Sequence, residues 1–262
     1  STIAKANLWM RFASKILIKV GEFKATTFDQ LFEGAKALDW GSWITEDGKF
    51  TVTGKSVKST LFSVPDCQAI VKKAVVEKLK QKYHVSWFDE TGADYTIQVA
   101  LLNDIATLTI DTSGGGLHKR GYRETAMVAP LKETLAAAMV DLSYWNKSRI
   151  LLDPMCGSGT IPIEAALIAR NIAPGLNRKF ASEGWARIDS GIWKQARIDA
   201  YKAINYDVMP QIYGSDMDEE AIEVAKENAI KAGVDDCIEF SVKPCQQVVL
   251  PGDYGCLITN PP

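Results

Sequence analysis

The stretch ILLDPMCGSGT, residues 150–160, decides the fold of this chain. It begins with three apolar residues, as expected of a short strand buried on both faces of a parallel sheet. Gly157 and Gly159 follow, and they allow the backbone to approach a ligand closely. The next residues, IPIEAALIARN, are predicted to form a helix. A strand, an acid, a Gly-x-Gly turn and a helix form the first unit of a nucleotide-binding doubly wound fold.

Two later stretches extend this pattern. In QIYGSDMDEEAI a second short apolar strand precedes Asp216, and an acid at this strand tip accepts hydrogen bonds from ribose hydroxyls in such folds. In CLITNPP a third buried strand is expected before Asn260, Pro261 and Pro262. The side-chain oxygen of Asn260 and the carbonyl of Pro261 are two acceptors that can share one planar amino group. The terminal motif therefore suits an exocyclic NH2.

Together the three motifs resemble those of the class I S-adenosylmethionine-dependent N-methyltransferases: an acid with a Gly-x-Gly loop, a ribose-binding acid and Asn-Pro-Pro-aromatic. Nearly the whole chain is similar to the THUMP-domain RNA methylases, specifically the bacterial 23S ribosomal RNA guanine-N2 methyltransferase group. The resemblance implies an α/β chain: a Rossmann-like domain with a doubly wound, mostly parallel sheet, preceded by an α/β THUMP domain. It also implies S-adenosyl-L-methionine as the cofactor and N2 of guanine in 23S ribosomal RNA as the methyl acceptor.

The resemblance also assigns roles to individual residues. Asp153 is expected to orient the glycine loop and the amino-acid end of the cofactor, and Asp216 to hold the ribose. The predicted catalytic residues are Asn260, Pro261 and Pro262. The predicted cofactor-binding residues are Asp153, Met155, Cys156, Gly157, Ser158, Gly159, Thr160, Asp216 and Met217. The predicted RNA-binding residues are Lys72, Lys73, Arg120 and Arg123, and no metal site is predicted.

The chemistry of such a reaction needs few catalytic groups. The sulfonium of the cofactor already makes the methyl group electrophilic, so the protein mainly has to hold a nitrogen in line with the methyl–sulfur bond. Two acceptors at the amino group favour the positive charge that develops on nitrogen as the new bond forms. No dedicated general base is then required, in agreement with the lack of His, Cys or carboxylate in the terminal motif.

Residues 1–112 are expected to form the THUMP-type RNA-binding domain. TFDQLFEGAKALDW is predicted to be a helix, with Thr27 and Gln30 spaced as a capping box. KFTVTGK is predicted to be a strand, and a second helix is predicted to begin with Asp66 as its N-cap. VSWFDE, YTIQVALL and IATLTID are predicted to be short strands, with a hairpin turn at residues 102–105.

The second predicted helix is rich in lysine and carries Lys72 and Lys73. Charge alone favours a merely solvated helix face, but the resemblance favours contact with RNA phosphates. Residues 113–129 are a predicted linker with the basic stretch HKRGYR, which the resemblance places beside the cofactor cleft. Arg120 and Arg123 in this stretch could hold a phosphate, although a structural basic turn explains them equally well.

Residues 130–262 are expected to form the methyltransferase domain. Pro130 is predicted to begin a helix, and residues 173–210 are predicted to be an insertion that contains the helix WKQARIDAYKAI. DEEAIEVAKENAIKAG is predicted to be a helix that ends at Gly233, and IEFSV is predicted to be the next strand.

Two features depart from the family: Pro244 takes the place of the usual acid near the adenine amino group, and the aromatic expected after Pro262 is absent. Further strands at the C-terminus and an extra segment at the N-terminus are also expected from the family.

Composition and charge limit the class of protein. The net charge of −2 argues against a uniformly basic nucleic-acid binder, although the N-terminal half is more basic than the rest. The 5 cysteines are scattered without Cys-x-x-Cys spacing, which argues against a zinc site and a disulfide framework. Cys156 is interpreted as a small residue beside a cofactor rather than a nucleophile. No apolar run is long enough to span a bilayer, so a cytoplasmic location is expected.

Three other functions compete with RNA methylation. Asn-Pro-Pro-aromatic also serves protein glutamine methyltransferases, but the THUMP-like N-terminal half favours RNA. A nicotinamide-dependent dehydrogenase would also place an acid after the second strand, but its third fingerprint glycine is replaced here by Pro162. An RNA-binding protein without catalysis stays open because of Pro244 and the missing aromatic.

Overall fold

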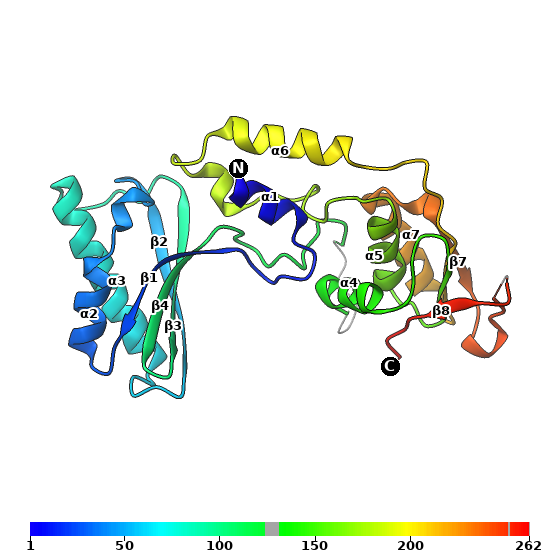
Figure 1. The fold of residues 1–262 in the computed structure, drawn as a ribbon, viewed down its shortest axis with the longest axis horizontal. Coiled ribbons are helices and arrows are strands. Elements are labelled where there is room, and N and C mark those ends of the chain that lie inside the picture. The colour runs from blue at the N-terminus through cyan, green and yellow to red at the C-terminus, as the bar shows by residue number, and fades with distance from the viewer. Residues whose placement is uncertain (124–130, 251, 262) are drawn as a thin grey trace. The chain divides into compact units, whose positions relative to one another are not determined.

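The computed structural model describes residues 1–123, 131–250 and 252–261. The chain folds into two compact units, each of which combines separate stretches of sequence (Figure 1). Unit 1 consists of Ser1–Ser14, Gly116–Lys179 and Lys194–Pro262, and unit 2 consists of Lys15–Gly115 and Phe180–Trp193.

Unit 2 is a four-stranded sheet covered on one face by two helices (Figure 1). The strands lie in the order β1-β4-β3-β2, with β2 and β3 parallel and the other pairs antiparallel. The helices α2 and α3 bury leucine, valine and alanine side chains against the sheet. The bounds are β1 Leu17–Lys24, α2 Phe28–Ala37, η1 Trp40–Ser42, β2 Lys49–Val57, α3 Val64–Tyr83, β3 Asp94–Leu102 and β4 Ile105–Asp111.

Local side-chain chemistry sets two of the predicted boundaries in unit 2. At the start of α2 the Thr27 hydroxyl accepts from the Gln30 amide at 3.2 Å, and Gln30 Oε1 accepts from the Thr26 amide at 2.8 Å. The predicted cap is confirmed, with the return bond one residue earlier than in a standard capping box. The hairpin turn between β3 and β4 is also confirmed: Asn103 and Asp104 have φ angles of 50° and 62°, which these residue types tolerate.

Other predictions for this unit were wrong. The helix α3 begins at Val64, and Ser63 rather than Asp66 is its N-cap; Pro65 in the first turn fits a helix start. VSWFDE forms no strand, because no neighbouring strand pairs with it, and Trp87 is 80% exposed. The strand β1 was not predicted, since a register shift between Lys19 and Gly21 interrupts its alternation.

Unit 1 contains a parallel four-stranded sheet in the order β7-β6-β5-β8. This is the predicted doubly wound arrangement, in which successive strands are added on one side of β5 and β8 returns to the other. The predicted helices after β5 and β6 are confirmed, and α7 is capped by Asp218 at its start and Gly233 at its end. The bounds are α1 Thr2–Trp9, α4 Glu133–Leu142, β5 Ile150–Asp153, α5 Thr160–Ala169, β6 Ile212–Asp216, α7 Glu219–Ala232, η3 Asp235–Cys237, β7 Ile238–Val242, η4 Cys245–Gln247 and β8 Gly255–Leu257.

Burial differs between the two strands that flank the switch in strand order. All residues of β5 are buried, as predicted for a strand covered on both faces. In contrast, β8 is a short and largely exposed strand, and Leu257 is 62% exposed. The expectation of a third buried strand was therefore wrong, because β8 is an edge strand of the sheet formed by the described residues.

The units do not follow the order of the chain. The α1 segment belongs to unit 1, where the Gly175 amide donates to the Leu8 carbonyl at 2.9 Å. The predicted insertion is divided between the two units. Residues 180–193 belong to unit 2, whereas most of α6 (Ser190–Lys202) belongs to unit 1. There Trp185 stacks on Tyr95 with ring centroids 4.8 Å apart. The division into domains at residues 112 and 129 stays a prediction about the sequence.

The described part of the chain lacks membrane-spanning helices and clusters of metal ligands. None of its helices has the length and apolar character needed to cross a membrane. It also contains no group of three His, Cys, Asp or Glu side chains arranged to hold a metal ion.

Candidate active site

The candidate site lies where the strand order of unit 1 reverses. Leu152 of β5 pairs with Leu257 of β8 on one side and with Tyr213 of β6 on the other. Because the strands are parallel, their carboxyl ends meet at the same edge of the sheet. Asp153 and Asp216 are the last residues of β5 and β6, and Thr259–Asn260 lie just after β8, so these residues come from the ends of three adjacent strands. Ligands of doubly wound folds bind at this position.

The glycine loop is fixed by hydrogen bonds to neighbouring elements. The Gly157 amide donates to Asp216 Oδ2 at 2.9 Å, and the Cys156 amide donates to the Ser215 carbonyl at 2.9 Å. From α7, Asn228 Nδ2 donates to the Ser158 carbonyl at 3.1 Å. The buried Asn228 was not predicted, because its partner lies 70 residues away in the sequence. These bonds hold the loop in place at the tips of β5 and β6.

Both loop glycines have left-handed backbone conformations. Gly157 has φ 49°, and a side chain there would meet no atom within 4 Å. Gly159 has φ 77°, and its missing side chain makes room for Ala225 and Phe240. Gly157 is therefore open toward the space above the loop, whereas Gly159 is required by packing. Gly159 is also the N-cap of α5 and has no side chain, so it makes no capping hydrogen bond to the first turn of that helix.

Asp153 is a buried carboxyl group at the tip of β5. Its Oδ1 accepts from the Met155 amide at 3.3 Å. Burial raises the pKa of Asp153 to about 6, and the nearby Asp216 acts in the same direction, while the hydrogen bond from the Met155 amide opposes the shift. The Ile258 amide donates to the Leu152 carbonyl at 3.0 Å, so the segment that carries Asn260 leaves β8 beside the tip of β5.

Asp216 lies at the tip of β6 and uses both carboxylate oxygens. Oδ2 accepts from Gly157, and Oδ1 accepts from the Asp218 amide at 3.1 Å. Each carboxylate oxygen can accept more than one hydrogen bond, so acceptor capacity remains for a ligand. The predicted cap of α7 is formed by Asp218, whose side chain accepts from Glu220 at 3.0 Å.

Cys156 has the environment of a structural cysteine. Its side chain is buried, with 7% exposed, and packs at the position where a Gly214 side chain would lie. Burial raises the pKa of the thiol far above its ordinary value, and the charges of Asp153 and Asp216 add to the shift. A thiolate nucleophile is therefore disfavoured at this position.

The linker residue Arg123 contacts the start of α5. One terminal nitrogen of its guanidinium donates to Thr160 Oγ1 at 2.5 Å and to the Leu131 carbonyl at 3.2 Å, and it lies 3.6 Å from Glu133 Oε1. Sequence analysis placed Arg123 near the cofactor cleft, but it missed Glu133, whose carboxylate is buried in α4. RNA binding by Arg123 stays a prediction, and its described contacts are with the glycine loop and α4.

Arg120 is part of a buried charged cluster. Its side chain lies 3.4 Å from Glu164 Oε1, and Glu164 on α5 is fully buried. Arg11 approaches the same carboxylate at 3.9 Å, and the Tyr122 hydroxyl donates to it at 3.2 Å. Burial raises the pKa of Glu164, while the two guanidinium groups lower it. Arg120 is 3% exposed, and its described role is structural, as a partner of Glu164. Its predicted role in RNA binding stays a prediction.

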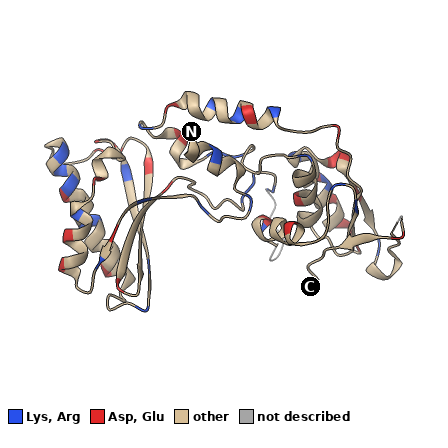
Figure 2. Cartoon of the chain, in the orientation of Figure 1, with Lys and Arg blue, Asp and Glu red and all other residues tan. Residues whose placement is uncertain are grey.

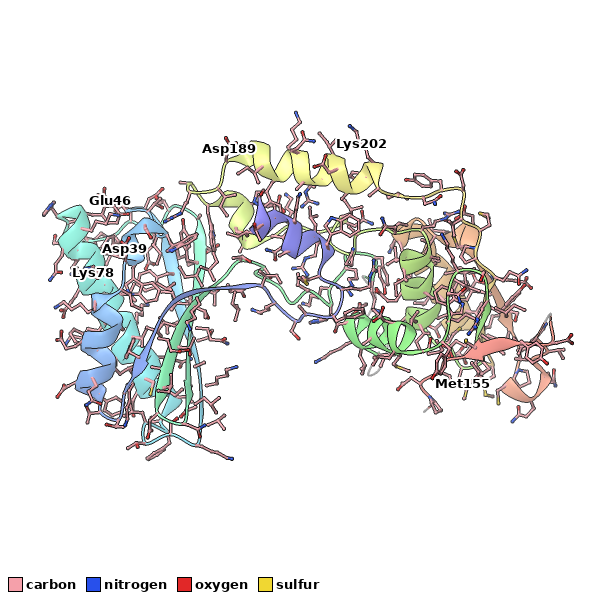
Figure 3. The ribbon with its side chains drawn as sticks, viewed as in Figure 1. Asp39, Glu46, Lys78, Met155, Asp189 and Lys202 are labelled. Carbon is pink, nitrogen blue, oxygen red and sulfur yellow. The ribbon has the colours of Figure 1, made fainter. Side chains whose placement is uncertain are left out.

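The remaining predicted residues differ in exposure. Ser158 and Thr160 are buried, and Met155 in the glycine loop (Figure 3) is half-buried. Met217, directly after Asp216, is 77% exposed. Asn260 and Pro261 are exposed at the end of the segment after β8, and Pro262 lies outside the described residues. Pro244 is the N-cap of η4, directly after β7. Lys72 and Lys73 are exposed on α3, a helix with many basic side chains (Figure 2).

Comparison with known proteins agrees with this geometry. The model of the family described as "RMKL-like, methyltransferase domain" matches residues 120–262, and the THUMP domain model matches residues 25–111. The "Putative RNA methyltransferase YpsC" of Bacillus subtilis is 52% identical over 262 residues, which cover 99% of this chain and 68% of YpsC.

Solved structures show the same similarity. A crystal structure from Listeria monocytogenes, titled a "predicted N6-adenine-specific DNA methylase", is 53% identical with a TM-score of 0.96, over 99% of this chain and 69% of that one. SMU.472, titled "a putative methyltransferase complexed with SAH", is 44% identical with a TM-score of 0.93, over 100% of this chain and 70% of that one. The expected Rossmann-like methyltransferase fold with a THUMP domain is confirmed. The chain belongs to the family of RMKL-like methyltransferase domains.

Proposed function

We propose that this chain transfers a methyl group from S-adenosyl-L-methionine to an exocyclic amino group of an RNA base, specifically N2 of guanine in 23S ribosomal RNA. The observation that carries the proposal is the parallel pairing of β5 with β8 at the reversal of strand order, in which the Ile258 amide donates to the Leu152 carbonyl at 3.0 Å. It brings a donor-binding acid and the Asn260 motif to neighbouring strand tips, where donor and acceptor have to meet.

The residues of the site fit S-adenosyl-L-methionine. The open side of Gly157 and the uncapped first turn of α5 offer space and amide donors for the amino-acid end of the donor. The Asp153 carboxylate would bind its ammonium group, and Asp216 would accept hydrogen bonds from the ribose hydroxyls. Met217, exposed beside Asp216, offers an apolar surface for the adenine. With Pro244 after β7, the adenine amino group would be recognised by backbone carbonyls.

The terminal motif would position the acceptor nitrogen. Bound donor supplies an electrophilic methyl group. The Asn260 side-chain oxygen and the Pro261 carbonyl would accept hydrogen bonds from the two hydrogens of the acceptor NH2. These acceptors stabilise the positive charge that develops on nitrogen, so they stabilise the transition state more than the ground state. The proton of the product ammonium can then leave to solvent.

An RNA substrate is supported by unit 2. The THUMP model matches residues 25–111, and the relative YpsC carries an RNA methyltransferase name. The exposed Lys72 and Lys73 on α3 provide positive charge for phosphates, and the ring of Phe32 lies 5.6 Å from Lys73 Nζ. The resemblance to the guanine-N2 methyltransferase group supports the choice of base.

A second candidate acceptor is N6 of adenine in DNA. The Listeria monocytogenes relative carries this function in its title, and two acceptors at the Asn-Pro-Pro motif suit N6 of adenine as well as N2 of guanine. One experiment distinguishes the candidates: incubation of the protein with donor labelled in the methyl group and with total RNA or genomic DNA, followed by nucleoside analysis. We expect label in N2-methylguanosine from RNA. Label in N6-methyldeoxyadenosine from DNA would favour the second candidate, and no label in either nucleic acid would contradict both.

The pKa of Asp153 predicts how donor binding depends on pH. A bound ammonium favours the ionised carboxylate, whereas free protein below pH 6 holds a proton on Asp153. Donor affinity is expected to be constant between pH 6 and 7.5 and to fall about tenfold for each pH unit below 6. Calorimetric titration across this range measures the effect.

The matched control for this titration is Asp153→Asn, which cannot ionise and should bind the donor weakly with no slope below pH 6. An equal slope in both proteins would assign the titration to another group. The same pKa shift opposes folding: a raised pKa means that the contribution of Asp153 to stability declines as pH rises from 3.8 to about 6.

Charge reversal at Lys72 and Lys73 tests the RNA-binding face. Lys72→Glu together with Lys73→Glu is expected to weaken RNA binding and to lower the slope of log K against log salt by about two, because two phosphate contacts are lost. The control replaces Lys5 and Lys147, which are exposed in unit 1, by Glu. If both double variants weakened RNA binding equally, the effect would come from the net charge of the chain and not from contacts of α3 with RNA.

A further inference from the structure

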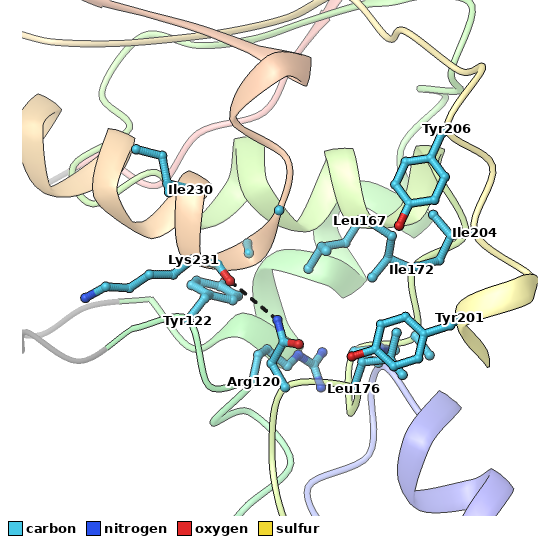
Figure 4. A pocket seen from close by; sticks show the side chains of 15 residues that line it. Arg120, Tyr122, Leu167, Ile172, Leu176, Tyr201, Ile204, Tyr206, Ile230 and Lys231 are labelled. Carbon is cyan, nitrogen blue, oxygen red and sulfur yellow. Dashed lines mark hydrogen bonds between the residues drawn. The ribbon is translucent and has the colours of Figure 1, made fainter. Parts of the chain in front are cut away.

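A second site is suggested by a cavity of about 190 Å3 in unit 1 (Figure 4). It is lined by Leu167 of α5, by residues of the segment after α5, by Tyr201 and Tyr206 at and after the end of α6, and by the last residues of α7. Both α5 and α7 start at the strand tips of the candidate active site. The 14 residues of α7 span about 20 Å, so the cavity at its far end is separate from the glycine loop.

Much of the cavity wall is apolar or aromatic. Leu167, Ile172 and Leu176 are buried, whereas Tyr201 and Tyr206 are 53% and 64% exposed. The two tyrosines are therefore accessible to a ligand beside a buried aliphatic surface. The guanidinium carbon of Arg170 lies 6.0 Å from the centroid of the Tyr206 ring, so a cation flanks this ring.

Several polar groups also line the cavity. Asn177 Nδ2 donates to the Lys231 carbonyl at 3.4 Å (Figure 4), which fixes the orientation of the Asn177 amide. The buried Arg120 and the exposed Lys231 line the cavity as well and add positive charge. This combination of apolar and aromatic walls with oriented polar groups is typical of sites that bind small planar molecules.

We propose that this cavity binds one unpaired nucleobase of the RNA substrate, remote from the base that is methylated. The volume is smaller than the range of about 300–1,000 Å3 of drug-sized pockets, and it therefore suits a single ring system. The tyrosine rings would stack on the base, the Asn177 amide would contact its edge, and Lys231 would lie near the phosphate. Stacking on aromatic side chains with basic residues beside them is how proteins hold single strands. The inference rests on the proposed RNA substrate.

The test compares two RNA probes with the whole chain. We would measure the Kd of a labelled single-stranded oligonucleotide and of a blunt duplex for wild type, Tyr201→Ala and Tyr206→Ala. Each variant is expected to bind the single strand about tenfold more weakly, because base stacking on an aromatic side chain contributes about 1–3 kcal/mol. Duplex binding should not change. Tyr201→Phe and Tyr206→Phe retain the ring and should restore most of the affinity.

Tyr144→Ala is the matched control, since Tyr144 is 89% exposed in the same unit and does not line the cavity. The proposal would be overturned if Tyr201→Ala and Tyr206→Ala bound the single strand with wild-type affinity, which is the result expected of a cavity that binds a peptide. It would also be overturned if Tyr144→Ala lost as much affinity as these two variants. Calorimetric titration of the methyl donor into the same proteins separates this outcome from the proposed function. Failure of wild type to bind the donor would contradict the proposed function. Native donor binding with no effect of the tyrosine variants would contradict only the second site.

Discussion

Replacing Asn260 by alanine is expected to reduce methyl transfer by about 10²–10³-fold, the cost of removing one hydrogen-bond partner of the charge that develops in a transition state. The amino group would lose one of its two acceptors and its alignment with the methyl–sulfur bond. Donor affinity should remain within about twofold of wild type, since Asn260 is assigned to the acceptor. Single-turnover transfer and donor calorimetry on the same preparation measure the two quantities.

Asn146→Ala provides the control for this experiment. Asn146 is exposed in a loop of unit 1, where its side-chain oxygen accepts from Ser148, and its loss should change neither quantity. Equal losses of transfer and donor affinity in Asn260→Ala would remove Asn260 from the acceptor site. An unchanged transfer rate would leave the Asn-Pro-Pro motif without a catalytic role.

The second large effect concerns stability. Glu164→Ala would leave the guanidinium groups of Arg11 and Arg120 in a buried site without their carboxylate, and it would remove the hydrogen bond of Tyr122. Loss of one partner of a buried ion pair costs about 3–5 kcal/mol, because the remaining charge stays desolvated. The urea midpoint of the chain, followed by far-UV circular dichroism, is expected to fall accordingly.

The exposed pair Glu223–Lys226 on α7 is the matched control, with side chains that are 63% and 48% exposed. Glu223→Ala should cost less than about 1 kcal/mol, because water already screens this pair. If Glu164→Ala were no more destabilising than Glu223→Ala, the buried cluster would not hold the linker and α1 segment onto α5.

Local patterns in the sequence predicted most of unit 1. The apolar run before Asp153 and the caps of α7 depend on neighbouring residues, so local spacing was enough to predict them. The wrong predictions have long-range causes. VSWFDE alternates like a strand but has no pairing partner, and β8 has the apolar content of a buried strand but lies at a sheet edge.

The supporting residues of the site were harder to predict. Asn228, Glu133 and Glu164 lie in helices, where the sequence alone suggests ordinary polar positions. Their function depends on partners such as Ser158, Arg123 and Arg120 that are distant in sequence. The same limitation explains why residues 1–14 and 180–193 could not be assigned to their units, since both depend on tertiary packing.

The central claim is that the tips of β5 and β6 hold the methyl donor. Calorimetric titration of S-adenosyl-L-methionine into wild type and Asp216→Ala tests it most directly. We expect one donor per chain in wild type and affinity about tenfold lower in the variant, the scale of a lost pair of charge-assisted hydrogen bonds. Equal affinity in the two proteins would contradict the claim.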